Sequence, residues 1–272
     1  MKTSPLISVS EFLSIKQNPI LIDAGSGDAA YARYKQKHLK GALYVDLNNH
    51  LAAVPEDAAN GGRHPLPSIE NFVELLGNLG ITPESHVVVY DDKQGSNAAA
   101  RFWWMLRAVG HTKVQVLNGG LQAAEAAGME MAYGIENSQS VSAYPITNWL
   151  LPMADINEVR NAVQNNAGCI IDVRDAERYR GLTEPLDPVA GHIPTAINIP
   201  LKGNLGVDGL FLSPEVLKEK YEAVFKNHAT EDIILHCGSG VTACHTLLAV
   251  AAAGLPMSKL YVGSWSEWCR NM

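Results

Sequence analysis

The chain contains the same succession of motifs twice within its 272 residues. In each half, an apolar run ending in a carboxylate precedes a histidine segment, a helix-start signal, a second apolar run and a glycine turn. The matched segments are Ile20–Asp23 with Cys169–Asp172, His38–Ala42 with His192–Ala196, Pro67–Glu70 with Ser213–Glu215, Val87–Asp91 with Ile233–Cys237, and Val116–Leu121 with Leu260–Trp265. Asp91 lies 68 positions after Asp23, and Cys237 lies 65 positions after Asp172. Because the register holds over this distance, the sequence predicts a tandem duplication.

Short apolar runs alternate with helical stretches in both halves, which is typical of β-α-β units and a mostly parallel sheet. Helices are expected at Ala98–Val109 and Thr242–Ala253. The predicted strands are Ile20–Asp23, Tyr44–Asp46, Val87–Tyr90, Val114–Leu117, Ile170–Val173, Ala196–Ile199, Ile233–His236 and Leu260–Val262. The predicted fold is α/β, with two tandem domains that each hold a mostly parallel sheet flanked by helices on both faces.

The repeat also sets the predicted domain boundaries. The first domain is expected to cover residues 1–132, and the second residues 151–272. Residues 133–150 between them are polar and weakly patterned, so they are expected to form a linker. Asp155, followed by Glu158 three positions later, is a helix-start signal for the second domain.

Composition and charge exclude several classes of function. The chain has 21 Lys and Arg against 28 Asp and Glu, a formal net charge of −7, and no basic block. A general surface for nucleic acids or anionic membranes is therefore not expected. The apolar run Leu247–Gly254 is far shorter than the ~20 residues that span a bilayer. Residues 1–18 lack the apolar segment of a secretion leader, so the expected location is the cytoplasm.

The four cysteines, Cys169, Cys237, Cys244 and Cys269, all lie in the last 104 residues. No pair has C-x-x-C spacing, and no histidine completes an H-E-x-x-H motif. A disulfide framework and a zinc site are therefore not expected. The chemistry is predicted to need no metal and no organic cofactor. The uneven distribution of cysteines indicates that the two halves differ in chemistry.

Cys237 is the strongest candidate for a reactive group. It follows the predicted strand Ile233–His236 and opens the loop Cys-Gly-Ser-Gly-Val-Thr before a predicted helix. In open α/β sheets, ligands bind beyond the carboxyl ends of the strands. The two glycines let the loop curl so that its N–H groups point at the sulfur, and the helix adds its positive end. These effects favour a thiolate, whereas a cysteine that only fills the core needs no such cradle.

This loop, the repeat and several flanking motifs resemble the rhodanese superfamily, specifically its two-domain sulfurtransferases. The motifs that carry the resemblance are Gly61–Pro67, Trp103–Met105, Gly191–Pro194 and Gly263–Trp268. The resemblance implies that Cys237 takes a sulfur atom from a donor and holds it as a persulfide. A thiol, a thioredoxin-like protein or cyanide then accepts the sulfur. It also implies that the first domain is catalytically silent, and Asp91 indeed stands at the position of Cys237 there.

The residues that follow the cysteine indicate which sulfur donor the protein uses. Thiosulfate-type members typically carry basic residues there, whereas this chain has Gly238 and Ser239, a string similar to that of 3-mercaptopyruvate sulfurtransferases. The resemblance implies that Ser239 assists proton handling as sulfur leaves the donor; a hydroxyl that only stabilises the loop is the alternative. The amides expected to cradle the persulfide are those of Gly238, Ser239, Gly240, Val241 and Thr242.

Members of the family hold the substrate carboxylate with arginines that lie before the Gly-His-Ile-Pro segment. Arg180 fits the first of these, and its planar fork suits an α-keto carboxylate; a solvated surface arginine is the alternative. No second arginine is present in residues 184–190, and Asn48 stands where the family pattern has an acid. The loop string favours 3-mercaptopyruvate as the donor, and these two departures from the family pattern count against it.

Other activities remain as alternatives. A thiosulfate:cyanide sulfurtransferase is the nearest, and a persulfide-carrier or regulatory module with little turnover of small donors is another. A cysteine phosphatase would need an arginine at position 243, where this chain has Ala243. The Gly25–Ala30 stretch is a weak dinucleotide fingerprint without a counterpart in the second half. His64 is either a turn residue or one that faces the cleft between the domains.

Overall fold

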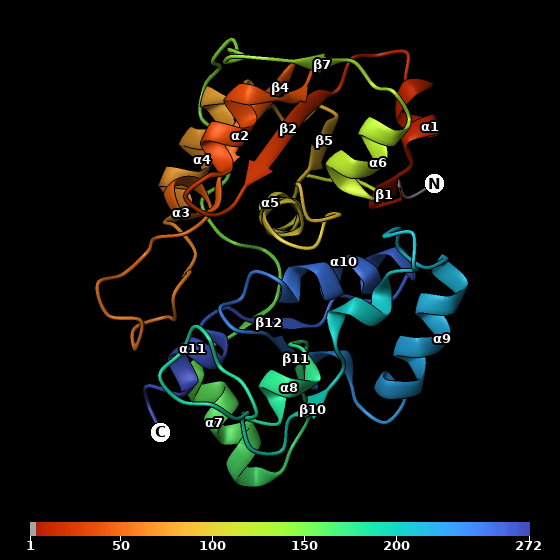
Figure 1. Ribbon diagram of the computed structural model, residues 1–272. Coiled ribbons are helices and arrows are strands. Elements are labelled where there is room, and N and C mark those ends of the chain that lie inside the picture. The colour runs from red at the N-terminus through yellow and green to blue at the C-terminus, as the bar shows by residue number, and fades with distance from the viewer. Residues whose placement is uncertain (1–3) are drawn as a thin grey trace. The chain divides into compact units, whose positions relative to one another are not determined.

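The computed structural model describes residues 4–272, so the first three residues of the expected 1–132 domain lie outside it (Figure 1). The chain divides into two compact units. The first unit consists of the residues up to Ala53, Pro67–Leu150 and Asp208–Leu210. The second unit consists of Val54–Leu66, Leu151–Val207 and Phe211–Met272. Segment 54–66 therefore groups with the second unit, although it belongs to the first half of the sequence.

The first unit is built on a five-stranded parallel sheet in the order β1-β6-β5-β2-β4. The strands are β1 (Leu6–Ile7), β2 (Ile20–Gly25), β4 (Ala42–Asp46), β5 (Val87–Tyr90) and β6 (Val114–Leu117). A small antiparallel ribbon joins β3 (His38–Leu39) to β7 (Met131–Ala132). The helices are α1 (Val9–Leu13), α2 (Ala30–Gln36), α3 (Leu47–His50), α4 (Ile69–Asn78), α5 (Ala98–Ala108) and α6 (Gly120–Ala126).

The second unit has a five-stranded parallel sheet in the order β10-β9-β11-β12-β8. Its strands are β8 (Met153–Ala154), β9 (Cys169–Asp172), β10 (Ile197–Asn198), β11 (Ile233–His236) and β12 (Lys259–Tyr261). Its α-helices are α7 (Ile156–Asn165), α8 (Ala176–Tyr179), α9 (Pro214–Phe225), α10 (Ala243–Ala252) and α11 (Ser264–Trp268). Two 3-10 helices, η1 (Leu201–Asn204) and η2 (Thr230–Asp232), complete it.

The two sheets have the same topology. Read from β8, the second order is β8-β12-β11-β9-β10, which matches β1-β6-β5-β2-β4 strand for strand. Helices flank both sheets (Figure 1). The predicted α/β fold with two tandem copies is therefore confirmed.

Both central strands are buried along their whole length, because helices pack directly on the sheets. All four residues of β5 and all four of β11 are buried. Helix α5 packs on β2, β5 and β6, and helix α10 packs on β11 and α9. Helix α10 begins six residues after Cys237, so a short loop at the carboxyl end of β11 must connect a buried strand to a buried helix.

Residues 133–150, expected to form a linker, pack on the first unit. The backbone N–H groups of Val141 and Tyr144 donate to carbonyls of α4 residues, at 2.9 and 3.1 Å. The N–H of Leu150 donates to the carbonyl of Ala108 at 2.6 Å. The segment therefore runs along the surface of one unit through regular main-chain hydrogen bonds.

Candidate active site

The loop from Cys237 to Thr242 is fixed by main-chain contacts with the turn that opens α11. The N–H of Cys237 donates to Ser264 Oγ at 3.2 Å, and the N–H of Trp265 donates to the Cys237 carbonyl at 3.1 Å. Gly240 has φ +71°, and a Cβ there would lie 2.4 Å from the carbonyl oxygen of Val262. Glycine is therefore required at position 240 by both conformation and space. Cys237 itself is 1% exposed.

The equivalent loop of the first unit holds an anion. The Asp91 carboxylate accepts backbone N–H bonds at 2.7–3.2 Å from Lys93, Gly95, Asn97 and Ala99. Burial raises the pKa of Asp91, and the four N–H donors oppose that shift. Each carboxylate oxygen accepts two of these N–H bonds, an arrangement that stabilises the ionised form. A loop at this position of the fold can thus hold negative charge with main-chain groups alone.

Ser239 and His64 lie in hydrogen-bond contact. His64 Nδ1 is 2.7 Å from Ser239 Oγ, and Ser239 is buried. The sequence left the role of His64 open, because the contact joins residues that are 175 positions apart. This pair places a titratable group beside the hydroxyl of the cysteine loop.

Segment 54–66 reaches this position through contacts with α11. The N–H of Gly61 donates to Glu267 Oε1 at 3.0 Å, and the N–H of Arg63 donates to Ser266 Oγ at 3.0 Å. Gly62 has φ +82°, and a Cβ there would lie 2.3 Å from the Gly263 carbonyl oxygen. The Gly-Gly pair thus lets the backbone approach α11 closely enough to bring the next two side chains to the loop.

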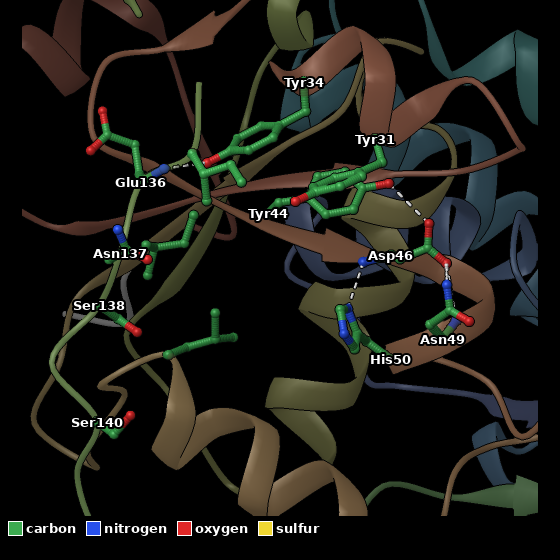
Figure 2. Close-up of a pocket in the computed structure, with 13 residues that line it drawn as sticks. Tyr31, Tyr34, Tyr44, Asp46, Asn49, His50, Glu136, Asn137, Ser138 and Ser140 are labelled. Carbon is green, nitrogen blue, oxygen red and sulfur yellow. Dashed lines mark hydrogen bonds between the residues drawn. The ribbon is translucent and has the colours of Figure 1, made fainter. Parts of the chain in front are cut away.

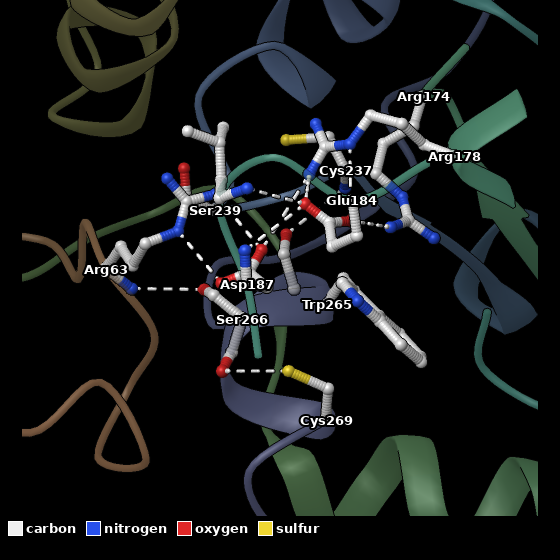
Figure 3. A network of polar contacts seen from close by, with 12 residues as sticks. Arg63, Arg174, Arg178, Glu184, Asp187, Cys237, Ser239, Trp265, Ser266 and Cys269 are labelled. Atoms are coloured by element: carbon white, nitrogen blue, oxygen red, sulfur yellow. Dashed lines mark hydrogen bonds and ion pairs between the residues drawn. The ribbon is translucent and has the colours of Figure 1, made fainter. Parts of the chain in front are cut away.

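A chain of arginine–carboxylate pairs surrounds the loop, as Figure 3 shows. Arg178 binds Glu184 through Nη2 at 2.7 Å and Nε at 3.3 Å. Arg63 binds Asp187 through Nε at 3.0 Å and Nη2 at 3.3 Å. A Cβ placed on Gly238 would lie 3.0 Å from Arg63 Nη2 and 3.4 Å from Arg178 Nη2. Two guanidinium groups therefore border the loop at the residue between Cys237 and Ser239.

Arg180, which was expected to bind the substrate carboxylate, lies elsewhere. Its side chain is exposed, and its Nε donates to the carbonyl of Ala176 in its own helical turn at 3.2 Å. The guanidinium of this segment that borders the loop belongs to Arg178 instead. The sequence did not single out Arg63, Arg178, Glu184 or Asp187 as functional; the signal available was the Gly-Gly-Arg-His string.

A buried ion pair lies beside the base of the loop. Arg174 and Asp172 are both buried, and Arg174 Nη2 donates to Asp172 Oδ2 at 2.6 Å. Burial by itself would raise the pKa of Asp172. The charges of His236 and Arg174, together with the hydrogen bonds that Arg174 donates, have the larger effect, so the pKa is lowered. Burial lowers the pKa of His236, the residue before Cys237, although the neighbouring Asp172 carboxylate opposes that shift. We assign His236 a packing role.

The first unit has a separate cavity of about 610 Å³ (Figure 2). Tyr31, Tyr34 and Tyr44 form one side of it, and Asp46 and His50 lie at another. None of the described residues that line it is a cysteine, lysine or arginine. Among the residues that line it, the cavity therefore offers no thiol and no lysine or arginine for an anionic sulfur donor.

Asp46 and Asn48 of the first unit belong to the start of α3. Asp46 caps this helix by accepting the N–H groups of Asn48 and Asn49 at 2.9 and 3.0 Å. The Asp46 carboxylate also accepts the Tyr44 hydroxyl at 2.9 Å. The carboxylate of Asp46 is thus engaged in local structure.

The described residues show two further features. None of the four cysteines is in a disulfide. Within residues 4–272, no cluster of three or more His, Cys, Asp or Glu side chains could hold a metal ion. Over the same range, every helix is too short or too polar to cross a membrane.

The chain is similar to known sulfurtransferases over most of its length. The family model described as "Rhodanese-like domain" matches residues 8–127 and 155–271. A Pseudomonas aeruginosa protein named "Probable 3-mercaptopyruvate sulfurtransferase" is 40% identical over 239 residues, covering 86% of this chain and 82% of that protein. The thiosulfate sulfurtransferase of Rattus norvegicus is 34% identical over 246 residues, covering 89% of this chain and 80% of that protein.

Solved structures agree with the sequence comparison. The 3-mercaptopyruvate sulfurtransferase from Leishmania major superposes with a TM-score of 0.86 at 29% identity, covering all of this chain and 76% of that one. Each match of the family model covers most of one copy of the repeated sheet. With a cysteine loop at the end of a central strand and a duplicated fold, the chain belongs to the rhodanese family and is a sulfurtransferase.

Proposed function

We propose that this sulfurtransferase takes sulfur from 3-mercaptopyruvate and carries it as a persulfide on Cys237. The observation that carries the proposal is the loop between β11 and α10, whose counterpart in the first unit holds the Asp91 carboxylate with four N–H groups. In the second unit the residue at that position is a cysteine. A loop that accommodates an anion favours a thiolate before the reaction and a persulfide anion after it. The proposed cradle consists of the amides of Gly238, Ser239, Gly240, Val241 and Thr242.

The proposed sulfur transfer is a nucleophilic displacement at the donor's sulfur. The Cys237 thiolate attacks the thiol sulfur of 3-mercaptopyruvate, so that an S–S bond forms and the C–S bond breaks. The electron pair of the C–S bond leaves with the three-carbon fragment as the enolate of pyruvate. Ser239 gives its proton to this enolate, and His64, 2.7 Å away, resupplies it. The proton released by the new persulfide balances the one taken up by pyruvate.

The cations beside the loop support a donor that carries a carboxylate. Arg178 lies next to Gly238, and its guanidinium can donate a hydrogen bond to a carboxylate. We therefore propose Arg178, in place of Arg180, as the arginine that binds the donor. The same cation also suits the sulfonate end of thiosulfate, which is the donor in the name of the Rattus norvegicus relative.

Intact-protein mass spectrometry tests the proposed carrier. Treatment with 3-mercaptopyruvate without an acceptor is expected to add the mass of one sulfur atom to the protein. Cys237→Ser is expected to lose both this adduct and turnover, whereas Cys169→Ala, a change at a different buried cysteine, is expected to keep both. An adduct that persists in Cys237→Ser would refute the assignment.

Paired kinetics decide the donor. The kcat/KM for 3-mercaptopyruvate is expected to exceed that for thiosulfate with the same acceptor. A strong preference for thiosulfate would overturn the donor assignment and leave the persulfide chemistry in place. Persulfide transfer to a partner protein with negligible turnover of both donors would instead identify a carrier module.

We further propose a thiol or a thioredoxin-like protein as acceptor, with cyanide as a substitute in the assay, and a cytoplasmic location. Four cysteines outside any disulfide suit a reducing compartment. The acceptor assignment is tested by the rate at which reduced thioredoxin discharges the persulfide. No faster discharge than by a simple thiol at equal concentration would contradict a protein acceptor.

A further inference from the structure

Asp187 lies in residues 184–190, the stretch in which the sequence lacks the second arginine expected for a substrate carboxylate. The side chain of Asp187 is buried and gathers cations around it. Arg63 binds it through Nε at 3.0 Å and Nη2 at 3.3 Å, and Arg270 Nη1 donates to it at 2.9 Å. An acidic residue in this stretch thus recruits an arginine from segment 54–66.

Asp187 holds Arg63 by one edge only. The Nε and Nη2 atoms face Asp187, and Nη1 has no hydrogen-bond partner among the described residues. Arg178 is held in the same way by Glu184, through Nε and Nη2. Both guanidinium groups lie against Gly238, so close that a Cβ at this position would crowd them. Each therefore keeps a donor for a further anion.

The charges in this network are unequal. Four arginines pair with three carboxylates. The arginines are Arg63, Arg174, Arg178 and Arg270, and the carboxylates are Asp172, Glu184 and Asp187. The three carboxylate side chains are each at most 3% exposed. Surplus positive charge at a site with little solvent favours the binding of an anion.

We infer that Arg63 and Arg178 together bind the carboxylate of the sulfur donor, and that Asp187 is the positioning residue that holds Arg63 for this purpose. The inference rests on the proposed function. Its new element is that the second carboxylate-binding arginine comes from segment 54–66 rather than from residues 184–190. The ligand class is a small α-keto acid, whose planar carboxylate matches donors from two guanidinium groups.

Two donors that differ only in the carboxylate test Arg63. Mercaptoacetone has the thiol and ketone of 3-mercaptopyruvate but a methyl group in place of the carboxylate. Arg63→Gln is expected to raise the KM for 3-mercaptopyruvate by about ten- to a hundredfold, the effect of losing a hydrogen bond to a charged group. The slower rate with mercaptoacetone is expected to be unchanged. Arg180→Gln, at an exposed site away from the loop, serves as the matched control with both donors unaffected.

The outcomes separate this inference from the proposed function. If Arg63→Gln leaves the KM for 3-mercaptopyruvate unchanged, or lowers the rates with both donors equally, the assignment of Arg63 is wrong. If the unmodified protein gains no sulfur on Cys237 from either donor, the proposed function itself fails. Thermal unfolding of each variant establishes that it is folded.

A charge exchange tests Asp187 independently. Arg63→Asp and Asp187→Arg are each expected to lower kcat/KM for 3-mercaptopyruvate at least tenfold. The double variant, which moves the arginine to position 187, is expected to regain a large part of that loss. A double variant whose kcat/KM falls by the product of the two single-variant losses would overturn the positioning role of Asp187.

Discussion

The proposed proton transfer by Ser239 depends on its neighbour His64. The Ser239 hydroxyl is a poor acid by itself, and the imidazole of His64, 2.7 Å away, is the group beside it that can pass a proton to it. If the two act as one unit, removing either should remove the function of both.

We therefore expect Ser239→Ala and His64→Asn to lower kcat by a similar factor, about a hundredfold or more. The double variant should be no worse than the single variants. His228→Asn, at an exposed histidine, is the control and should retain full activity. Steady-state kinetics of the four variants and the unmodified protein measure this, and multiplicative losses would show that the residues act separately.

The position of Arg178 explains why residue roles were only partly predictable. Arg178 and Arg180 flank Tyr179 at the end of α8, and two helical positions differ by about 200° around the axis. They therefore face opposite sides, and only the packing of α8 decides which one faces the loop. Cys237 and Ser239 could be singled out because strand, loop and helix are consecutive in sequence. His64 and Arg63 could not, because their contacts depend on the tertiary fold.

At the scale of elements, long apolar runs predicted the strands well. Val87–Tyr90, Val114–Leu117 and Ile233–His236 have the predicted bounds, and each strand is buried along its whole length. The strands β1 and β8 were not predicted, because each has only two residues and lies at a sheet edge. Such strands depend on pairing with a neighbour rather than on their own pattern.

The loop after β5 leads to a stability prediction for the first unit. In Asp91→Asn, an NH₂ group would replace an oxygen that accepts two N–H bonds, for example those of Asn97 and Ala99. Buried donors would then lack an acceptor, so the unfolding free energy should fall by about 1–3 kcal/mol. Asp92→Asn, which removes only a 3.9 Å contact with Arg33, should change it little. Chemical denaturation compares the two, and equal stabilities would contradict the role of the loop.

Buried or half-buried histidines occur in both units and should make the whole molecule sensitive to acid. Burial lowers the pKa of His50, His111 and His236. The unfolded chain takes up protons at these residues below about pH 6.5, whereas the folded chain does so only at lower pH. Protonation thus favours the unfolded chain as the pH falls through this range.

We therefore expect the unfolding free energy to decrease from pH 7 to pH 5. Asp172, whose lowered pKa contributes stability above about pH 3.9, should add a further loss only at more acidic pH. Denaturant unfolding at pH 7, 6 and 5 measures the first effect. A free energy that stays constant over this interval would contradict it.

The occupied loop of the first unit also gives the protein an internal spectroscopic standard. The amides of Lys93, Gly95, Asn97 and Ala99 report, through their ¹H and ¹⁵N chemical shifts, what a loop of this kind looks like when it is filled by an anion. As Cys237 becomes persulfidated, the amide resonances of residues 238–242 should move in the direction of those downfield signals. A single NMR titration would thus follow one loop during sulfur loading while the other remains as the unchanging reference in the same molecule.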